Sequence, residues 1–256
     1  GMVHLGPLPG SPRDSGDFTA VLRRAVEDAR TLEEGGIDAL MVENFFDAPF
    51  YKAGVPSVTV AAMTATVLAI RDAVAIPVGV NVLRNDACAA MSIAHVCGAA
   101  FIRCNVYVGA AITDQGIIEG AARTAILYRR ELSADVAIWA DVFVKHAAQL
   151  GTSTLEDAAK DAVLRGLADA LIVSGAATGA ATDPEMARRV KAVVPGTPVL
   201  IGSGFDVQTA PTLLAHADGA IVGTSLKREG SVAEPVDAER VRALRSAMEM
   251  TRFCSP

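Results

Sequence analysis

The sequence is poor in aromatic residues, which make up 5% of its 256 positions and include a single Trp. An all-β sandwich would normally show more aromatic residues alternating along its strands. Hydrophobic residues nevertheless account for 51% of the chain, and this content argues against intrinsic disorder. Small aliphatic side chains dominate the hydrophobic content, as is typical of parallel strands that helices cover on both faces.

Cysteine is also scarce, with four residues and no C-x-x-C pair: Cys88, Cys97, Cys104 and Cys254. Two of them lie in apolar segments, where a thiol behaves as a small hydrophobic group. We therefore expect all four to be reduced thiols in a cytoplasmic protein.

Long runs of a single kind are missing as well. The formal net charge is −6 and no Lys/Arg run occurs, which argues against nucleic acid and anionic membrane surfaces as partners. The longest apolar stretch is interrupted by Arg71 and Asp72, so no transmembrane segment is expected. The first residues lack the features of a signal peptide, and Gly1 before Met2 is typical of a residue left by an expression vector.

What the sequence does contain is a regular alternation of β-rich and helical patterns. The predicted strands are residues 2–5, 37–43, 77–83, 101–106, 136–144, 170–173, 198–201 and 220–222. The predicted helices are residues 18–34, 57–74, 86–96, 118–132, 154–165, 184–193, 207–215 and 237–253. Eight such units in about 250 residues predict one α/β domain over residues 1–256, a closed, parallel, eight-stranded (β/α)8 TIM barrel. An open doubly wound sheet is the alternative, but the G-x-G-x-x-G turn expected after its first strand is absent.

Two glycine-bearing turns directly follow the last two predicted strands: Gly202-Ser203-Gly204 and Gly223-Thr224-Ser225. Their backbone amides could bind a phosphate, because this is where such barrels frequently hold one. Ser174 and Gly175, after the sixth strand, are assigned to the same site. Glycine could instead serve only the sterics of a tight turn, and Lys227 could either add a charge or be solvated.

Polar side chains gather at the carboxyl ends of the other strands, where barrel active sites lie. Buried charges are costly unless they are paired, so these residues are either lumen ion pairs, such as Arg103 with Asp141, or ligand contacts. We assign catalytic roles to Asp141, Lys145, Glu43 and Arg103, and substrate binding to Asn81, Asn105, His4 and His146.

The expected chemistry is acid–base catalysis, with Asp141 or Glu43 as the base and Lys145 or Arg103 stabilising an oxyanion. A Schiff base at Lys145 is an alternative. No metal-ligand spacing occurs, so neither a metal nor a cofactor is predicted. Aromatic residues in two loops form either a lid over the pocket or a surface for a protein partner; they are Phe45, Phe46, Phe50, Tyr51 and Tyr107.

Several long motifs resemble the BtpA/SgcQ family. They are MVHLGPLPGSP at residues 2–12, VENFFDAPF at 42–50, GVNVLRND at 79–86, TDQGIIEG at 113–120, ADVFVKHA at 140–147 and ADALIVSG at 168–175. One departure is Gly204-Phe205-Asp206, where the family pattern has a smaller residue and a Thr.

The resemblance implies a barrel similar to the ribulose-phosphate-binding group, with a phosphorylated small molecule as ligand. One member is linked to photosystem I biogenesis at the thylakoid surface, and another belongs to a sugar-utilisation gene set. Two hypotheses follow: an aldolase-, isomerase- or epimerase-like enzyme acting on a sugar phosphate, or a non-catalytic assembly or regulatory factor with a vestigial pocket. The second implies peripheral membrane or protein-complex association. A homo-oligomer is compatible with both.

Overall fold

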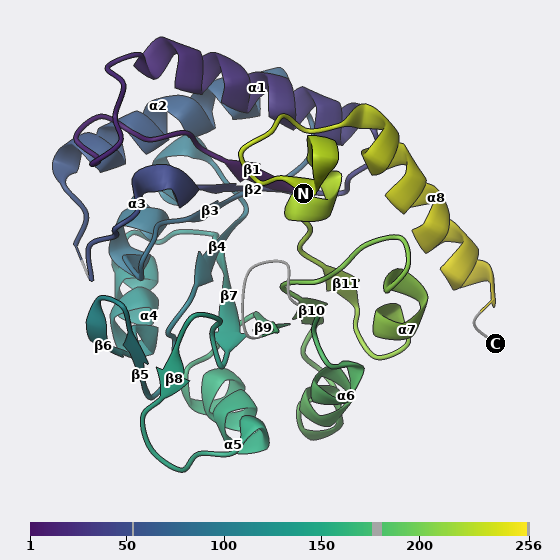
Figure 1. The fold of residues 1–256 in the computed structure, drawn as a ribbon. Coiled ribbons are helices and arrows are strands. Elements are labelled where there is room, and N and C mark those ends of the chain that lie inside the picture. Colours follow the sequence, from purple (N-terminus) through teal and green to yellow (C-terminus); the bar gives the residue numbers. More distant parts are fainter. Residues whose placement is uncertain (53, 176–180, 255–256) are drawn as a thin grey trace.

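A curled parallel sheet of eight strands, surrounded by helices, forms the centre of the structure (Figure 1). The computed structural model describes residues 1–52, 54–175 and 181–254. The strands follow the spatial order β1 (Met2–His4), β2 (Leu40–Glu43), β3 (Val78–Asn81), β4 (Phe101–Cys104), β7 (Ala137–Val142), β9 (Ala170–Val173), β10 (Val199–Ile201) and β11 (Gly219–Ala220). The predicted parallel α/β architecture is therefore confirmed, because every pairing in this sheet is parallel.

The helices lie on the outside of the curled sheet (Figure 1). They are α1 (Phe18–Glu34), α2 (Ser57–Ala73), α3 (Ala87–Cys97), α4 (Ala122–Glu131), α5 (Leu155–Lys160), α6 (Pro184–Val193), α7 (Ala210–Leu214) and α8 (Ala238–Cys254). Local sequence sets several ends: the Asp86 carboxylate accepts from the Ala89 N–H, and Gly98 ends α3 with φ 64°. Asp183 caps α6 just before Pro184. Pro56 occupies the N-cap position of α2, directly before Ser57.

On four strands, the side chains that face the inside of the sheet change from apolar to polar towards the carboxyl end. Residues two positions apart on a strand point to the same side, and in each of these strands the first is apolar and the second is polar. The pairs are Met2 and His4, Met41 and Glu43, Phe101 and Arg103, and Trp139 and Asp141. The apolar members pack together, with Phe101 and Trp139 stacked 3.7 Å apart between ring centroids. The polar members consequently form a layer at the carboxyl ends of the strands.

The two ends of the sheet approach each other through the backbone. The Met2 N–H donates to the carbonyl of Val222 at 2.9 Å, which links β1 to the residues that follow β11. The paired strands run from β1 to β11, and no ladder joins β11 to β1 within the described residues. Eight parallel strands and their curl are thus established, whereas full closure of the barrel stays a prediction.

A three-stranded antiparallel sheet was not expected from the sequence. It consists of β6 (Gly116–Glu119), β5 (Ala110–Thr113) and β8 (Ala148–Gln149), and we call it the flap. Residues 107–117 were predicted as a loop and residues 118–132 as a helix, but β6 occupies the start of that helix and α4 begins only at Ala122. Ala111 and Ile118 face inward onto Val106 and Val144. Their register neighbours Ile112 and Ile117 are exposed.

Three of the four cysteines are free thiols in the described structure: Cys88, Cys97 and Cys104. The side chain of Cys254 lies outside the described residues. Among the helices described, none has the length and apolar character needed to cross a membrane.

Candidate functional site

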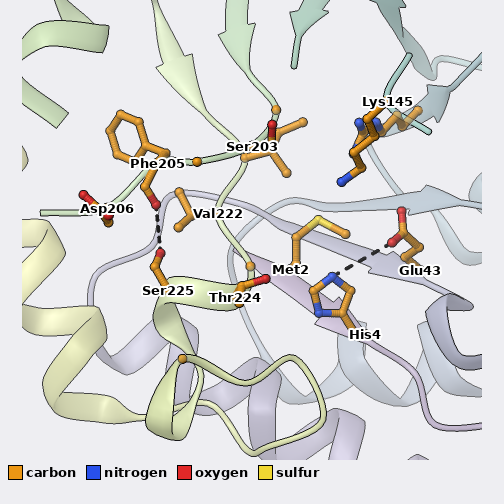
Figure 2. A pocket seen from close by; sticks show the side chains of 16 residues that line it. Met2, His4, Glu43, Lys145, Ser203, Phe205, Asp206, Val222, Thr224 and Ser225 are labelled. Atoms are coloured by element: carbon orange, nitrogen blue, oxygen red, sulfur yellow. Dashed lines mark hydrogen bonds and ion pairs between the residues drawn. The ribbon is translucent and has the colours of Figure 1, made fainter. Parts of the chain in front are cut away.

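A cavity opens at the carboxyl ends of the strands (Figure 2). It brings together both predicted glycine-bearing turns and four of the polar residues: His4, Glu43, Arg103 and Lys145. These residues come from opposite ends of the sequence and meet because the sheet curls.

The two glycine-bearing turns lie side by side on the wall of the cavity. The Ser225 hydroxyl donates to the Phe205 carbonyl at 2.8 Å, which joins one turn to the other. The backbone N–H groups of residues 203–205 and 223–225 donate to no acceptor within the described part of the chain. Backbone N–H groups that converge and have no acceptor in the protein are a chemical arrangement able to bind an anion.

Glycine is needed in both turns because other residues approach closely. A Cβ at Gly202 would stand 2.3 Å from the Ser174 Oγ and 2.6 Å from a methyl group of Ile172. A Cβ at Gly223 would stand 2.8 Å from the His4 ring. The steric explanation for these glycines therefore holds, and it is compatible with anion binding.

The carboxyl end of β9 contacts the turn after β10, but Ser174 and Gly175 are not among the residues that line the main cavity. The Gly175 N–H donates to the Ser203 Oγ at 2.8 Å, so Ser203 connects this strand end to the turn after β10. Ser174 is buried, and its hydroxyl has no hydrogen-bond partner in the described structure. The predicted loop continues through residues 176–179, which lie outside the described residues.

His4, Glu43 and Asn81 occupy one level of the sheet, because β1, β2 and β3 pair in register there. The Asn81 amide donates to one carboxylate oxygen of Glu43, and the other oxygen lies 3.9 Å from the His4 Nε2. Burial lowers the pKa of His4 well below its usual value, and the cations Lys227, Lys145 and Arg103 lower it further. His4 is therefore a neutral imidazole at physiological pH, able to accept or donate a proton.

A pH titration of stability should detect this neutral histidine. Below about pH 6.5 the unfolded chain binds a proton at His4 that the folded protein does not bind. The free energy of unfolding therefore decreases as the pH is lowered, by up to ~1.4 kcal/mol per pH unit. We expect His4→Gln to reduce that slope by about one proton's contribution. The measurement is urea denaturation at a series of pH values from about 7 to 5.

His95→Gln provides the control, because it removes an imidazole from the exposed surface of α3. If the native protein and both variants show the same slope, His4 does not remain neutral in the folded state.

Arg103 and Asp141 form the ion pair that the sequence predicted. Two parallel hydrogen bonds of 2.8 Å join the guanidinium to the carboxylate, and both side chains are buried. Burial alone would lower the pKa of Arg103, but the Asp141 charge and hydrogen bond raise it above the usual value. The Asn105 amide donates to the same carboxylate at 3.0 Å. Asp141 and Asn105 line a neighbouring cavity under the flap, whereas Arg103 reaches the main one.

Several sequence-based expectations change in detail. Lys227 does not reach the turns, because its ammonium is buried and bonds to Asp28 at 2.7 Å. His146 is exposed and lines neither cavity. Tyr107 is buried and donates to the Gly166 carbonyl, so it belongs neither to a lid nor to an exposed surface. The ring of Phe45 packs against the ring of His4, with 4.8 Å between their centroids, as expected of a lid residue.

Sequence reasoning missed six residues that line the cavity: Met2, Phe205, Asp206, Ile221, Val222 and Gly230. Phe205 and Asp206 directly follow Gly204, so their place in the turn was the available signal. Asp206 accepts from the N–H groups of Gln208 and Thr209 in the turn before α7, and Thr209, at the N-cap of α7, makes no capping hydrogen bond with its side chain. Among the described residues, no group of three His, Cys, Asp or Glu side chains could hold a metal ion.

The sequence matches one known family over nearly the whole of its length. A profile of the BtpA family covers residues 1–250. The chain belongs to the BtpA family. It is 51% identical to the photosystem I biogenesis protein BtpA of Synechocystis sp., over 97% of this chain and 86% of that protein. It is 34% identical to the putative sgc region protein SgcQ of Escherichia coli, over 94% and 90% of the two chains.

The solved structures that resemble this BtpA-family chain share its fold at low sequence identity. They include KGPDC from Streptococcus mutans, with a TM-score of 0.58 and 14% identity over 90% of this chain and 93% of that one. Phosphoribosyl anthranilate isomerase from Thermus thermophilus gives a TM-score of 0.55 and 15% identity, over 88% and 94%. These likenesses establish TIM-barrel neighbours and leave the reaction open.

Proposed function

We propose that this BtpA-family protein is an enzyme that binds a phosphorylated sugar or a similar anionic metabolite in the main cavity. The observation that carries the proposal is the set of unpaired amides at residues 203–205 and 223–225, which line one wall together. Backbone amides bind a phosphate without a counter-charge of their own. Lys145 and Arg103 place positive charge at this cavity, although the chain as a whole has a net charge of −6.

The polar layer opposite the turns supplies the chemistry. Glu43 would act as the general base, a role supported by its carboxylate, which lines the cavity and lies close to neutral His4. Asp141 instead holds Arg103 in position, since both of its oxygens accept from Arg103. Arg103 and Lys145 would stabilise an oxyanion as it forms at the carbonyl of the metabolite. This arrangement fits isomerisation, epimerisation and aldol cleavage alike.

Unsatisfied polar atoms also favour a ligand at this layer. Buried polar groups are normally hydrogen-bonded, yet the His4 Nδ1, Asn81 Oδ1 and Ser174 Oγ have no partner in the described structure. The hydroxyl and carbonyl groups of a sugar phosphate would satisfy atoms of this kind.

The same proposal includes closure of the barrel. It is supported by the hydrogen bond from the Met2 N–H to the Val222 carbonyl and by the close approach of Gly223 to His4. TIM-barrel neighbours with TM-scores of 0.53 to 0.58 point in the same direction. Closure would fix the turn after β11 against β1 and so define the size of the site.

Inorganic phosphate and sugar phosphates should stabilise the folded protein. At a ligand concentration about 100 times the dissociation constant the gain is about 2.7 kcal/mol, or roughly 5–11 °C in melting temperature for a chain of this size. The measurement is thermal unfolding with each compound, with chloride at equal ionic strength as the control. The absence of a shift with phosphate and with every sugar phosphate would contradict the proposed site.

A second candidate function is that of an assembly factor, in line with the name of the Synechocystis relative, photosystem I biogenesis protein BtpA. Ile112 and Ile117 on the flap, together with Leu150 beside it, are exposed apolar side chains that a protein partner could cover. Phosphate titration separates the two roles, because partner binding through the flap requires no anion.

A further inference from the structure

Lys145 is presented to the cavity by an unusual piece of backbone. It follows β7, and the residues two before and one after it, Phe143 and His146, both have positive φ angles near 57°. Residues other than glycine adopt this conformation at a cost of roughly 1–3 kcal/mol, and such strain concentrates at functional sites. The Arg84 guanidinium holds the bend by donating to the Lys145 carbonyl at 2.8 Å. Figure 2 shows the ammonium directed into the space between Ser203 and Glu43.

The Lys145 ammonium has no acceptor of its own. Within the described residues it forms no hydrogen bond or ion pair, because Glu43 is engaged by Asn81 and Asp141 by Arg103. Lys227, which is fully buried, shows the contrasting structural arrangement, in which the charge is paired with Asp28. Lys145 is half-buried and faces the cavity without such a partner, so no ion pair accounts for its position.

The surroundings of Lys145 lower the pKa of its ammonium below that of an exposed lysine. Burial lowers its pKa most, and Arg103 and Arg84 lower it as well, against opposing effects of Glu43 and Asp141. Each unit of lowering raises the free amine fraction at neutral pH about tenfold. A free amine is a nucleophile towards carbonyl carbon, whereas an ammonium is not.

We propose that Lys145 forms a Schiff base with the carbonyl carbon of a phosphorylated aldehyde or ketone held in the cavity. The inference rests on the proposed function, since the phosphate turns would bring the carbonyl compound to the amine. It also narrows the substrate class, because a phosphorylated compound without a carbonyl group could not react.

The covalent step balances without any added oxidant or reductant. The Nζ lone pair adds to the carbonyl carbon while the C=O π bond breaks, giving a carbinolamine after one proton moves from nitrogen to oxygen. The hydroxyl then leaves as water with a second proton, and a C=N bond forms. Glu43 and neutral His4 lie on the same wall and carry these protons. The resulting iminium draws electrons from the neighbouring carbon, which is what aldol cleavage and isomerisation require.

Borohydride trapping tests this proposal. The full-length protein is incubated with dihydroxyacetone phosphate, reduced with sodium borohydride and examined by intact-mass and peptide mass spectrometry. The expected product gains the mass of the probe less one oxygen, on Lys145. Labelling there should exceed labelling of exposed Lys160 by at least about tenfold. Dihydroxyacetone, which lacks the phosphate, should label Lys145 much less, and glycerol 3-phosphate, which lacks the carbonyl, should not label it at all.

Two variants complete the experiment. Lys145→Arg keeps the positive charge and should lose the adduct while still showing the thermal shift with phosphate. Lys160→Arg removes an exposed lysine of α5 and should leave the adduct unchanged. Labelling spread evenly over exposed lysines, or retained mass gain in Lys145→Arg, would overturn the proposal.

The outcomes also separate this inference from the function on which it rests. A thermal shift with glycerol 3-phosphate but no adduct with the ketone phosphate would remove Lys145 as nucleophile and keep the anion site. Equal labelling of Lys145 by dihydroxyacetone and by dihydroxyacetone phosphate would support Lys145 as nucleophile and rule out the anion site. If neither the thermal shift nor the adduct is observed, both the anion site and the nucleophile are ruled out.

Discussion

Replacing Asp141 with Asn should lower the free energy of unfolding by about 3–5 kcal/mol. The carboxylate of Asp141 accepts two hydrogen bonds from Arg103 and one from Asn105, and its side chain is fully shielded from solvent. An amide of the same shape carries no charge, so the Arg103 guanidinium would remain buried without a counter-ion. Breaking a buried pair by removing one partner is costly for this reason, even where the intact pair adds little to stability.

Urea denaturation, analysed by linear extrapolation, measures the effect of Asp141→Asn. Glu156→Gln is the matched control, because it removes the carboxylate from a bidentate pair with Arg189 on the surface. Solvent screens an exposed pair, so we expect little change in stability from the control. Should Asp141→Asn be as stable as the native protein, Arg103 must find another partner, and the account of Asp141 as its positioning residue fails.

The elements that the sequence predicted well are those that depend on local pattern. The eight strands alternate with helices because short aliphatic runs and amphipathic runs carry different periods. The pair Arg103 and Asp141 was foreseeable too, since two charges within apolar strands need each other. Likewise, the meeting of the glycine turns follows from parallel strands ending at one face.

Features that depend on distant contacts could not be predicted in this way. Lys227 pairs with Asp28 across 199 positions of sequence, and nothing near either residue signals the other. The flap strands carry only two to four residues each and pack against Val106 and Val144, so their pattern becomes visible only with that surface in place. The sequence around Lys145 likewise indicates only the end of a strand, and the positive φ angles of Phe143 and His146 have no signal in the local pattern.

Gly202→Ala should weaken phosphate binding by roughly 10- to 100-fold. The added methyl group would overlap the Ser174 Oγ and Ile172, and Ile172 is fully buried in the lumen and has no room to move. The backbone of residues 202–204 would therefore shift away from Ser174, carrying the amides of the turn with it. A hydrogen bond to a charged group contributes about 1.5–3 kcal/mol, and each 1.4 kcal/mol is a tenfold change in affinity. Overpacking should also cost about 1–3 kcal/mol of stability.

Gly196→Ala is the matched control, since Gly196 lies before β10, at the opposite end of the same strand from Gly202. A Cβ there would meet no heavy atom within 4 Å, so the same chemical change should leave phosphate affinity and folding close to native. Calorimetric titration of phosphate into the three proteins measures the affinities directly. Equal affinities would place the anion elsewhere than at the turn after β10. Loss in Gly202→Ala alone would assign that turn to the binding site, because both variants carry one added methyl group and differ only in what surrounds it.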